Sequence, residues 1–142
     1  MNIYLDTSVL IPTLVREAAS DVVKAYLTTR QERLISDFAA VEVASALSRL
    51  VRTGRLAAAE ATARLADFDT WRAATSSVVD LHAADARLSL AYVRRFELML
   101  RAPDALHLAI TNRVQATLLT LDRRMERAAR QLGIAVDVPQ TN

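Results

Sequence analysis

The sequence of 142 residues contains no cysteine, two glycines and a single lysine, and each scarcity excludes a class of function. Without cysteine there is no disulfide and no thiolate metal site, so any metal must be held by oxygen or histidine ligands. With only Gly54 and Gly133, the chain has no glycine-rich loop of the kind that cradles phosphates in P-loop and Rossmann proteins. Nucleotide binding of those two types is therefore excluded.

Long apolar runs and an N-terminal targeting signal are also missing. No segment approaches the ~20 apolar residues that cross a bilayer, and no basic stretch with a following apolar region opens the chain. The 52% of hydrophobic residues is enough for one buried core, and the lack of cysteine fits a reducing compartment. We therefore expect one soluble, cytoplasmic domain over residues 1–142, without membrane contact, in which 139–142 form a tail.

The positive charge is almost entirely arginine, because Lys24 is the only lysine among 18 basic residues. Arginine binds phosphates through a planar, bidentate fork and keeps its proton, which suits contact with a polyanion. A genome that prefers arginine codons explains the same bias equally well. The net charge of +2 alone does not choose between them.

Short apolar runs and helical spacings alternate along the chain. The runs predict strands at about 2–5, 33–35, 77–81, 117–121 and 134–138. Between them, apolar residues at helical spacing predict helices at 18–29, 37–52, 57–71, 83–95, 103–114 and 123–132. Gly54 ends one helix and makes 37–71 a helical hairpin, whereas 96–102 is expected to be a loop or a broken helix. The alternation predicts an α/β sandwich around a parallel sheet.

Four acidic residues are expected at one end of this sheet. Asp6 follows the first strand and Asp122 follows the fourth, and open parallel sheets bind ligands at the carboxyl ends of their strands. Asp104 opens a helix that runs antiparallel to the strand before Asp122, so both acids reach the same rim. Glu42 lies about a turn and a half into the helix after the second strand.

Three of the four acids also have a purely structural interpretation. Asp6 and Asp104 can cap turns or helices, and Glu42 can pair with Arg49. The helical neighbours of Glu42, however, form a small and mostly apolar face, on which a half-buried carboxylate needs a cation or a proton. These neighbours are Phe38, Ala39, Ser45 and Ala46.

Four carboxylates at one rim require neutralisation. Each close pair repels by roughly 4 kcal/mol at 4 Å in an effective dielectric near 20. Oxygen ligands without cysteine select a hard ion, Mg²⁺ or Mn²⁺. Such an ion polarises a phosphoryl oxygen and orients a water, which is the chemistry of phosphodiester hydrolysis.

With these residues identified, the chain resembles the PIN-domain ribonucleases, and most closely the VapC-like toxins of bacterial type II toxin–antitoxin systems. Four segments across almost the whole chain carry the resemblance: Ile3-Tyr4-Leu5-Asp6-Thr7-Ser8, Ser36-Asp37-Phe38-Ala39-Ala40-Val41-Glu42, Pro103-Asp104-Ala105-Leu106-His107-Leu108-Ala109 and Leu119-Thr120-Leu121-Asp122. It implies a three-layer α/β/α sandwich with a central parallel sheet of four to five strands. It also implies an endoribonuclease that hydrolyses RNA with metal-activated water and is inhibited by a cognate antitoxin protein.

The resemblance also implies roles for single residues. The catalytic and metal-binding set is Asp6, Glu42, Asp104 and Asp122, with Mg²⁺ or Mn²⁺ as the cofactor. The hydroxyl groups expected to orient these carboxylates belong to Thr7, Ser8 and Thr120.

The remaining acids and histidines are given lesser roles. His107 lies three residues after Asp104 and could bind the metal, but packing or a hydrogen bond is the preferred interpretation. His82 is expected to start a helix. Asp80 and Asp85 are interpreted as solvated or capping residues.

Two surfaces are left open by the sequence. Arginines flank Asp104 and Asp122 and either contact RNA phosphates or form a solvated face; they are Arg101, Arg123, Arg124, Arg127 and Arg130. Apolar residues of the first helices either pack in the core or bury surface in a homodimer, which we expect, or against the antitoxin; they are Val22, Val23, Leu47, Leu50 and Val51.

Rival functions are weighed by the same residues. A receiver-like domain or a phosphatase normally places a lysine near the phosphoryl group. The only lysine here, Lys24, is expected in an early helix away from the rim, which argues against both functions. A housekeeping PIN nuclease, or a non-catalytic RNA- or protein-binding module of the same fold, remains the alternative. A non-catalytic module predicts degraded acids, whereas all four are intact.

Overall fold

The computed structural model describes residues 1–140 and contains one five-stranded sheet with the order β3-β2-β1-β4-β5. The strands are β1 (Asn2–Leu5), β2 (Glu32–Ser36), β3 (Ser77–Val79), β4 (Thr117–Leu119) and β5 (Val136–Asp137). All neighbouring strands are parallel, as predicted. Of the predicted tail 139–142, residues 141 and 142 lie outside the described residues.

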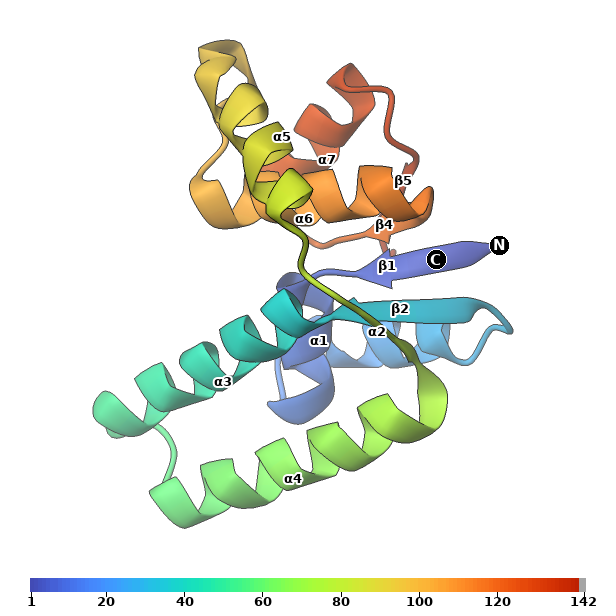
Figure 1. Cartoon of the computed structure of the whole chain (residues 1–142). Helices are drawn as coiled ribbons and strands as arrows, with labels where there is room; N and C mark the ends of the chain where they lie inside the picture. The colour runs from blue at the N-terminus through green and yellow to red at the C-terminus, as the bar shows by residue number, and fades with distance from the viewer. Residues whose placement is uncertain (141–142) are drawn as a thin grey trace.

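Helices cover both faces of the sheet (Figure 1). On one face lie α1 (Thr7–Leu14), α2 (Ser20–Leu27), α3 (Asp37–Arg52) and α4 (Ala58–Thr75). On the other lie α5 (Ala83–Arg94), α6 (Ala102–Val114) and α7 (Arg123–Gln131), with the short 3₁₀ helix η1 (Phe96–Leu98) between α5 and α6. The predicted three-layer α/β/α sandwich is confirmed.

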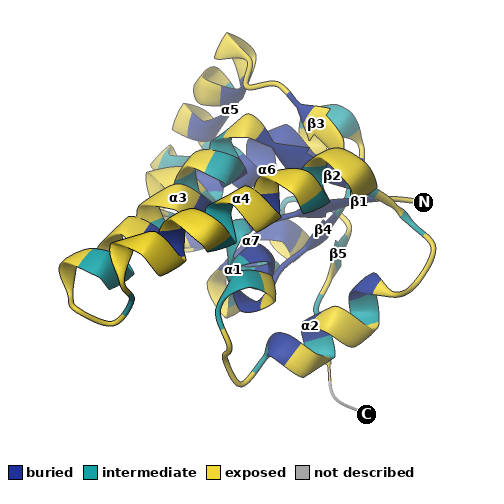
Figure 2. Ribbon diagram, turned by 90° about the horizontal axis from the view of Figure 1, so that it is seen from below, coloured by how far each residue is buried: buried dark blue, intermediate teal, exposed yellow. Residues whose placement is uncertain are grey.

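The core consists of two apolar clusters, one on each face of the sheet. Ile3 and Leu5 of β1 belong to the cluster beneath α1–α4, while Tyr4 belongs to the cluster beneath α5–α7. This alternation follows from the period of two along a strand. Figure 2 shows that β1, β2 and β4 are largely buried, while the edge strands β3 and β5 are partly exposed and α3 and α4 expose their outer faces.

Helix α1 is absent from the sequence prediction. It has eight residues, contains Pro12 and is apolar around most of its circumference, so no helical periodicity marks it. Asp6 begins it as the N-cap, accepting a hydrogen bond from the backbone of Val9. The helix therefore starts at the first predicted site residue.

Two turns set the direction of the chain as predicted. Gly54 has a φ of 72° and closes α3, which gives the helical hairpin of α3 and α4. Between α5 and α6 the chain forms η1 and then a left-handed residue, Met99, with a φ of 55°. This broken stretch carries the chain back so that α6 begins at the rim, with Asp104 in its first turn.

Some strands end before their predicted limits. The N–H of Thr120 still donates to the backbone oxygen of Asp137 in β5, and only the next two N–H groups leave the sheet: that of Leu121 donates to Ser8 Oγ and that of Asp122 to Thr120 Oγ1. The hydroxyl groups of Ser8 and Thr120 thus bond both the Asp6 carboxylate and the backbone that follows β4. No helix within residues 1–140 is long and apolar enough to cross a membrane.

Candidate active site

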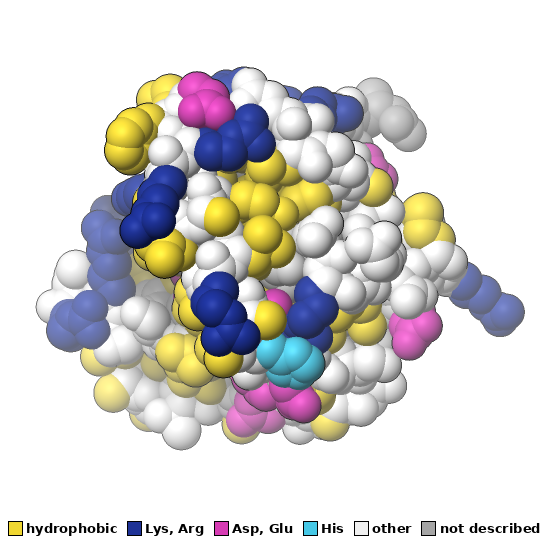
Figure 3. Space-filling view, turned by 45° about the horizontal axis from the view of Figure 1, so that its top comes forward, with side chains coloured by type: hydrophobic (Ala, Val, Ile, Leu, Met, Phe, Trp, Pro, Cys, Tyr) yellow, Lys and Arg dark blue, Asp and Glu magenta, His cyan; other side chains and the backbone are white. Residues whose placement is uncertain are grey.

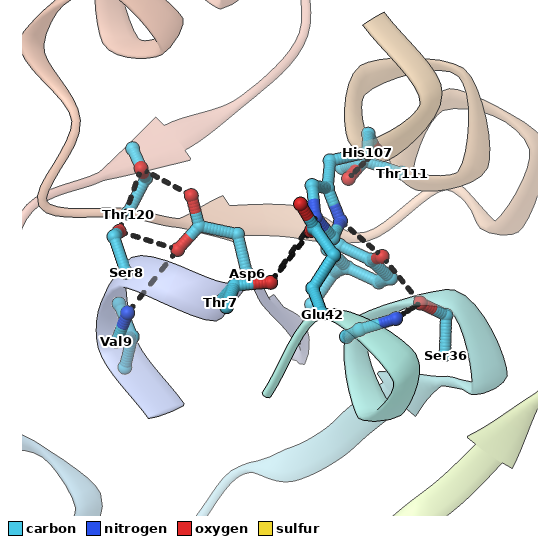
Figure 4. A network of polar contacts seen from close by, with 11 residues as sticks. Asp6, Thr7, Ser8, Val9, Ser36, Glu42, His107, Thr111 and Thr120 are labelled. Carbon is cyan, nitrogen blue, oxygen red and sulfur yellow. Dashed lines mark hydrogen bonds and ion pairs between the residues drawn. The ribbon is translucent and has the colours of Figure 1, made fainter. Parts of the chain in front are cut away.

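Asp6 lies at the carboxyl end of β1, beside the end of the neighbouring strand β4. Its side chain is 1% exposed. Ser8 Oγ donates to Oδ1 over 2.6 Å, Thr120 Oγ1 donates to Oδ2 over 2.6 Å, and the Val9 N–H donates to Oδ1 over 3.3 Å (Figure 4). Both oxygens are therefore held in one orientation, and Ser8 and Thr120 make the contacts that the sequence predicted for them.

Burial raises the pKa of the Asp6 carboxyl above its ordinary value. The nearby His107 and the hydrogen bonds from Ser8, Thr120 and Val9 act in the opposite direction but do not cancel the burial. A buried carboxylate in this state gains from a nearby cation, which would stabilise its charged form.

Glu42 projects from α3 toward the same end of the sheet (Figure 4). Thr7 Oγ1 donates to Glu42 Oε1 over 2.7 Å, and His107 Nε2 is bonded to the same oxygen. Burial acts to raise the pKa of Glu42, but His107 and Thr7 together outweigh it and hold the pKa below its ordinary value. The partners of Glu42 are thus His107 and Thr7, and not Arg49, among the contacts of the described residues.

Asp104 and Asp122 approach each other from two elements. Asp104 lies in the first turn of α6, and Asp122 is the N-cap of α7, where Oδ1 accepts from the backbone N–H groups of Arg124 and Met125 over 2.9 and 3.2 Å. Burial raises the pKa of Asp104, and the negative charge of Asp122 raises it further. The predicted proximity of Asp104 and Asp122 is therefore present, and Asp122 has a capping role that the sequence analysis did not predict.

His107 lies near three of the four acids, and the fourth, Asp122, lies near Asp104. His107 is bonded to Glu42, and its electrostatic interaction with Asp6 and Asp104 acts to lower the pKa of both carboxyls. The four acids therefore share one end of the sheet. No three Asp, Glu or His side chains within residues 1–140, however, are grouped closely enough to hold a metal ion between them.

The donor set nevertheless fits Mg²⁺ or Mn²⁺ chemically. Burial raises the pKa of both Asp6 and Asp104, and the neighbouring groups that act to lower it do not cancel this effect. Mg²⁺ usually binds through one or two carboxylates, keeps several waters and takes further ligands from substrate phosphates. An ion held by a pair of carboxylates and by water is consistent with this arrangement, whereas a closed cage of protein ligands is not.

His107 has a hydrogen-bonding role, in agreement with the preferred interpretation. The ring is 2% exposed, and its two nitrogens are bonded to Tyr4 Oη, over 2.7 Å, and to Glu42. Tyr4 Oη is also 2.7 Å from Ser36 Oγ. Sequence reasoning missed Tyr4 because it stands in an apolar strand, although a buried tyrosine hydroxyl usually requires a polar partner.

The interpretation of Asp85 as a solvated residue is wrong, while the capping interpretation is confirmed. Asp85 is 1% exposed, its Oδ2 accepts from the His82 N–H over 2.8 Å, and Arg113 donates to both carboxylate oxygens over 2.7 and 3.0 Å. His82 starts α5 as its N-cap, as predicted. Asp80 is exposed, and its backbone oxygen accepts from Arg113.

The arginines near Asp104 and Asp122 are exposed, and two of them have partners. Arg123 and Arg130 each lie 3.2 Å from a carboxylate oxygen of Glu126. On the side viewed in Figure 3 the basic side chains stand apart around an apolar patch and do not form one continuous basic surface. Both interpretations of these arginines, phosphate contact and a solvated face, therefore stay predictions.

Comparison with known proteins identifies the fold family. The family model described as "PIN domain" matches residues 3–131. The chain belongs to the PIN-domain family. Over 140 residues it is 36% identical to Ribonuclease VapC46 of Mycobacterium tuberculosis, covering 96% of this chain and 97% of that protein.

Solved structures share the fold of this PIN domain at low sequence identity. VapBC2 from Rickettsia felis, bound to a DNA fragment from its promoter, superposes with a TM-score of 0.71 at 13% identity and covers 97% of this chain and 98% of that one. VapC20 of Mycobacterium tuberculosis, described as a sarcin-ricin loop cleaving toxin, gives a TM-score of 0.71 at 18% identity, covering 89% and 94%. FitAB bound to a DNA fragment gives 0.75 at 19% identity, covering 99% and 97%.

Proposed function

We propose that this PIN domain is a Mg²⁺- or Mn²⁺-dependent endoribonuclease and the toxin of a toxin–antitoxin pair. The observation that carries the proposal is Asp6, a fully buried carboxylate clamped by two hydroxyl groups at the end of β1, with three further acids at the same end of the sheet. The 36% identity to Ribonuclease VapC46 over nearly the whole chain supports the choice of RNA as substrate.

Some residues of the chain would bind the ion, and others keep those ligands in their orientation. Asp6 and Asp104 would hold the ion, with Glu42 and Asp122 beside them. Bound there, the ion would polarise a phosphodiester and lower the pKa of a water. Ser8 and Thr120 keep the Asp6 carboxylate in place, and Asp122 is fixed by the backbone N–H groups that it caps.

A groove of about 650 Å³ leads away from this site along α3. Thr7 and Glu42 line one end, and three arginines, Arg49, Arg52 and Arg55, line the stretch toward the turn between α3 and α4. These three side chains are exposed, and Arg52 is bonded to Ser48. A strand of RNA lying in this groove would place its phosphates against guanidinium groups and one phosphodiester near the acids.

Replacing the three groove arginines together (Arg49→Ala, Arg52→Ala, Arg55→Ala) is expected to weaken RNA binding by about tenfold or more. Each lost phosphate contact should lower the slope of log K against log salt by about 0.7 for a single strand. Binding of a fluorescent RNA to a cleavage-deficient Asp6→Asn protein, measured from low to moderate salt, gives both numbers.

The control replaces three exposed arginines that do not line the groove, Arg30, Arg87 and Arg94, by alanine. This variant carries the same change of net charge, so a general loss of electrostatic attraction affects both proteins equally. If both triple variants lose the same affinity and the same salt slope, the groove is not the path of the RNA.

The partners of the chain are proposed on the same basis. VapBC2 and other toxin–antitoxin assemblies share its fold, so we propose a cognate antitoxin protein as its inhibitor. The homodimer expected from the apolar helices stays a prediction, which light scattering of the purified chain would check.

The function is tested by incubating the purified protein with total RNA and Mg²⁺ or Mn²⁺. We expect cleavage that EDTA abolishes and that Asp104→Asn reduces by more than about 100-fold, since changes that only affect the surroundings of a metal ligand already cost 10–100-fold. The matched control is Asp69→Asn, an exposed carboxylate on α4, which should cleave as the wild type does. Cleavage that persists in EDTA or in Asp104→Asn would contradict the proposal, as would the absence of any cleavage.

A further inference from the structure

A chain of buried hydrogen bonds runs from the start of α3 to the side chain of Glu42 on the same helix (Figure 4). It begins at the N-cap Ser36, whose Oγ accepts from the Ala39 N–H over 2.9 Å. The other hydrogen bond of Ser36 Oγ among the described residues is to Tyr4 Oη, at 2.7 Å. Because a backbone N–H can only donate, the hydroxyl proton of Ser36 finds an acceptor only when it points at Tyr4.

The direction of this hydrogen bond determines the direction of the other hydrogen bonds in the series. Tyr4 Oη accepts from Ser36 and donates its own proton to His107 Nδ1, 2.7 Å away. An accepting Nδ1 leaves the ring proton of neutral His107 on Nε2, which then donates to Glu42 Oε1. Thr7 Oγ1 donates to the same oxygen.

The opposite polarity leaves a buried proton without an acceptor. If His107 donated from Nδ1, Tyr4 would have to donate to Ser36, and the Ser36 hydroxyl would accept from both neighbours. Ser36 is 0% exposed, and a buried unsatisfied hydroxyl costs about 1–3 kcal/mol. When each group donates to the next one, from Ser36 to Glu42, every hydroxyl and ring proton in the series has an acceptor.

The ring of His107 is also fixed by packing. The Phe38 ring centroid lies 5.1 Å from that of His107, and the Tyr4 centroid lies 5.7 Å from it. The His107 side chain is almost completely buried, which restricts rotation of the ring. Orientation and proton position are therefore set by neighbours on β1, β2 and α3, and not by Glu42 alone.

We propose that His107 is a positioning residue: as the neutral Nε2–H tautomer selected by Ser36 and Tyr4, it holds Oε1 of Glu42 and leaves Oε2 as the oxygen for a metal ligand contact. The role of Glu42 as a ligand rests on the proposed function. The position of the ring proton rests on the hydrogen bonds alone.

The test compares Tyr4→Phe with the matched control Thr111→Val. Tyr4→Phe removes the hydroxyl that donates to Nδ1 and keeps the ring. Thr111→Val removes a different buried hydroxyl, on α6, whose one hydrogen bond within residues 1–140 is to the backbone oxygen of His107. Nitrogen-15 NMR of histidine-labelled protein reports the tautomer, and binding of Mn²⁺ alone, measured by electron paramagnetic resonance, reports the ligand site.

We expect the Nε2–H tautomer in the wild type and in Thr111→Val, and a loss of this preference in Tyr4→Phe. Affinity for Mn²⁺ should fall by about tenfold in Tyr4→Phe and stay within about twofold in Thr111→Val. His107→Gln, which keeps an N–H donor for Glu42, should retain more Mn²⁺ affinity than His107→Leu. Thermal melting of each variant separates loss of fold from loss of position.

The Nδ1–H tautomer in the wild type would overturn the proposal, as would equal Mn²⁺ affinity in Tyr4→Phe and the wild type. Equal affinity in His107→Gln and His107→Leu would also count against it. None of these measurements uses RNA. A wild-type protein that binds Mn²⁺ and cleaves no RNA would therefore contradict the nuclease function and leave the tautomer and affinity comparisons to decide the role of His107.

Discussion

Asp6→Asn is expected to abolish metal-dependent cleavage and at the same time to leave the fold as stable as the wild type or more stable. The activity should fall by more than about 100-fold, because the change removes a charged oxygen that would hold the ion. The fold keeps what Asp6 contributes to it, since asparagine is an equally good N-cap for α1 and can still bond to Ser8 and Thr120.

The raised pKa of Asp6 determines whether Asp6→Asn stabilises or destabilises the fold at a given pH. The folded pKa of Asp6 is raised by burial, so its folded state favours the protonated form. In the metal-free protein the resulting stabilisation is present at low pH and is lost as the pH rises from the ordinary value of about 4 through the raised pKa. Asp6→Asn has no such group, and its stability should exceed that of the wild type most clearly near neutral pH.

Urea unfolding of both proteins in EDTA, from about pH 4 to pH 8, checks this prediction. The control is Asp21→Asn, an exposed carboxylate that pairs with Arg16 at the surface. A wild type that is clearly more stable than Asp6→Asn at neutral pH in EDTA would show that the Asp6 carboxylate stabilises the fold, contrary to the argument from burial.

The sheet and the rim could be predicted because they follow from general rules of parallel sheets. Asp6 and Asp122 each follow an apolar run, and the carboxyl ends of parallel strands share one edge. The approach of Asp104 to Asp122 required only that α6 run antiparallel to β4. Local pattern and chain direction were sufficient for these features.

The contacts around Glu42 and Asp85 could not be predicted in the same way. Tyr4 and His107 are 103 residues apart in the sequence, and Asp85 and Arg113 are 28 apart. Which side chains meet across β1, α5 and α6 depends on the packing of those elements, and no periodicity encodes it. Tyr4 carried one signal, a polar hydroxyl in a strand expected to be fully buried.

Arg113→Met is expected to lower the free energy of unfolding by about 3 kcal/mol or more at neutral pH. Arg113 of α6 donates twice to Asp85, which is 1% exposed at the start of α5, and once to the backbone oxygen of Asp80. Removing one partner of a buried ion pair leaves an uncompensated charge, which typically costs 3–5 kcal/mol. The double variant Asp85→Asn with Arg113→Met removes that charge and should recover part of the loss.

The advantage of the wild type over Arg113→Met should depend on pH with a definite sign. Burial acts to raise the pKa of Asp85, but Arg113 and the His82 N–H outweigh it, so the folded pKa lies below the ordinary value. The stabilisation is therefore complete above the ordinary value of about 4 and is lost as the pH falls through the folded pKa. Urea midpoints near pH 7 and near pH 3 measure the change, with Arg94→Met, an exposed arginine on α5, as the control. A difference of less than about 1 kcal/mol at pH 7 would mean that the two helices are held together by apolar contacts and that the ion pair only completes the start of α5.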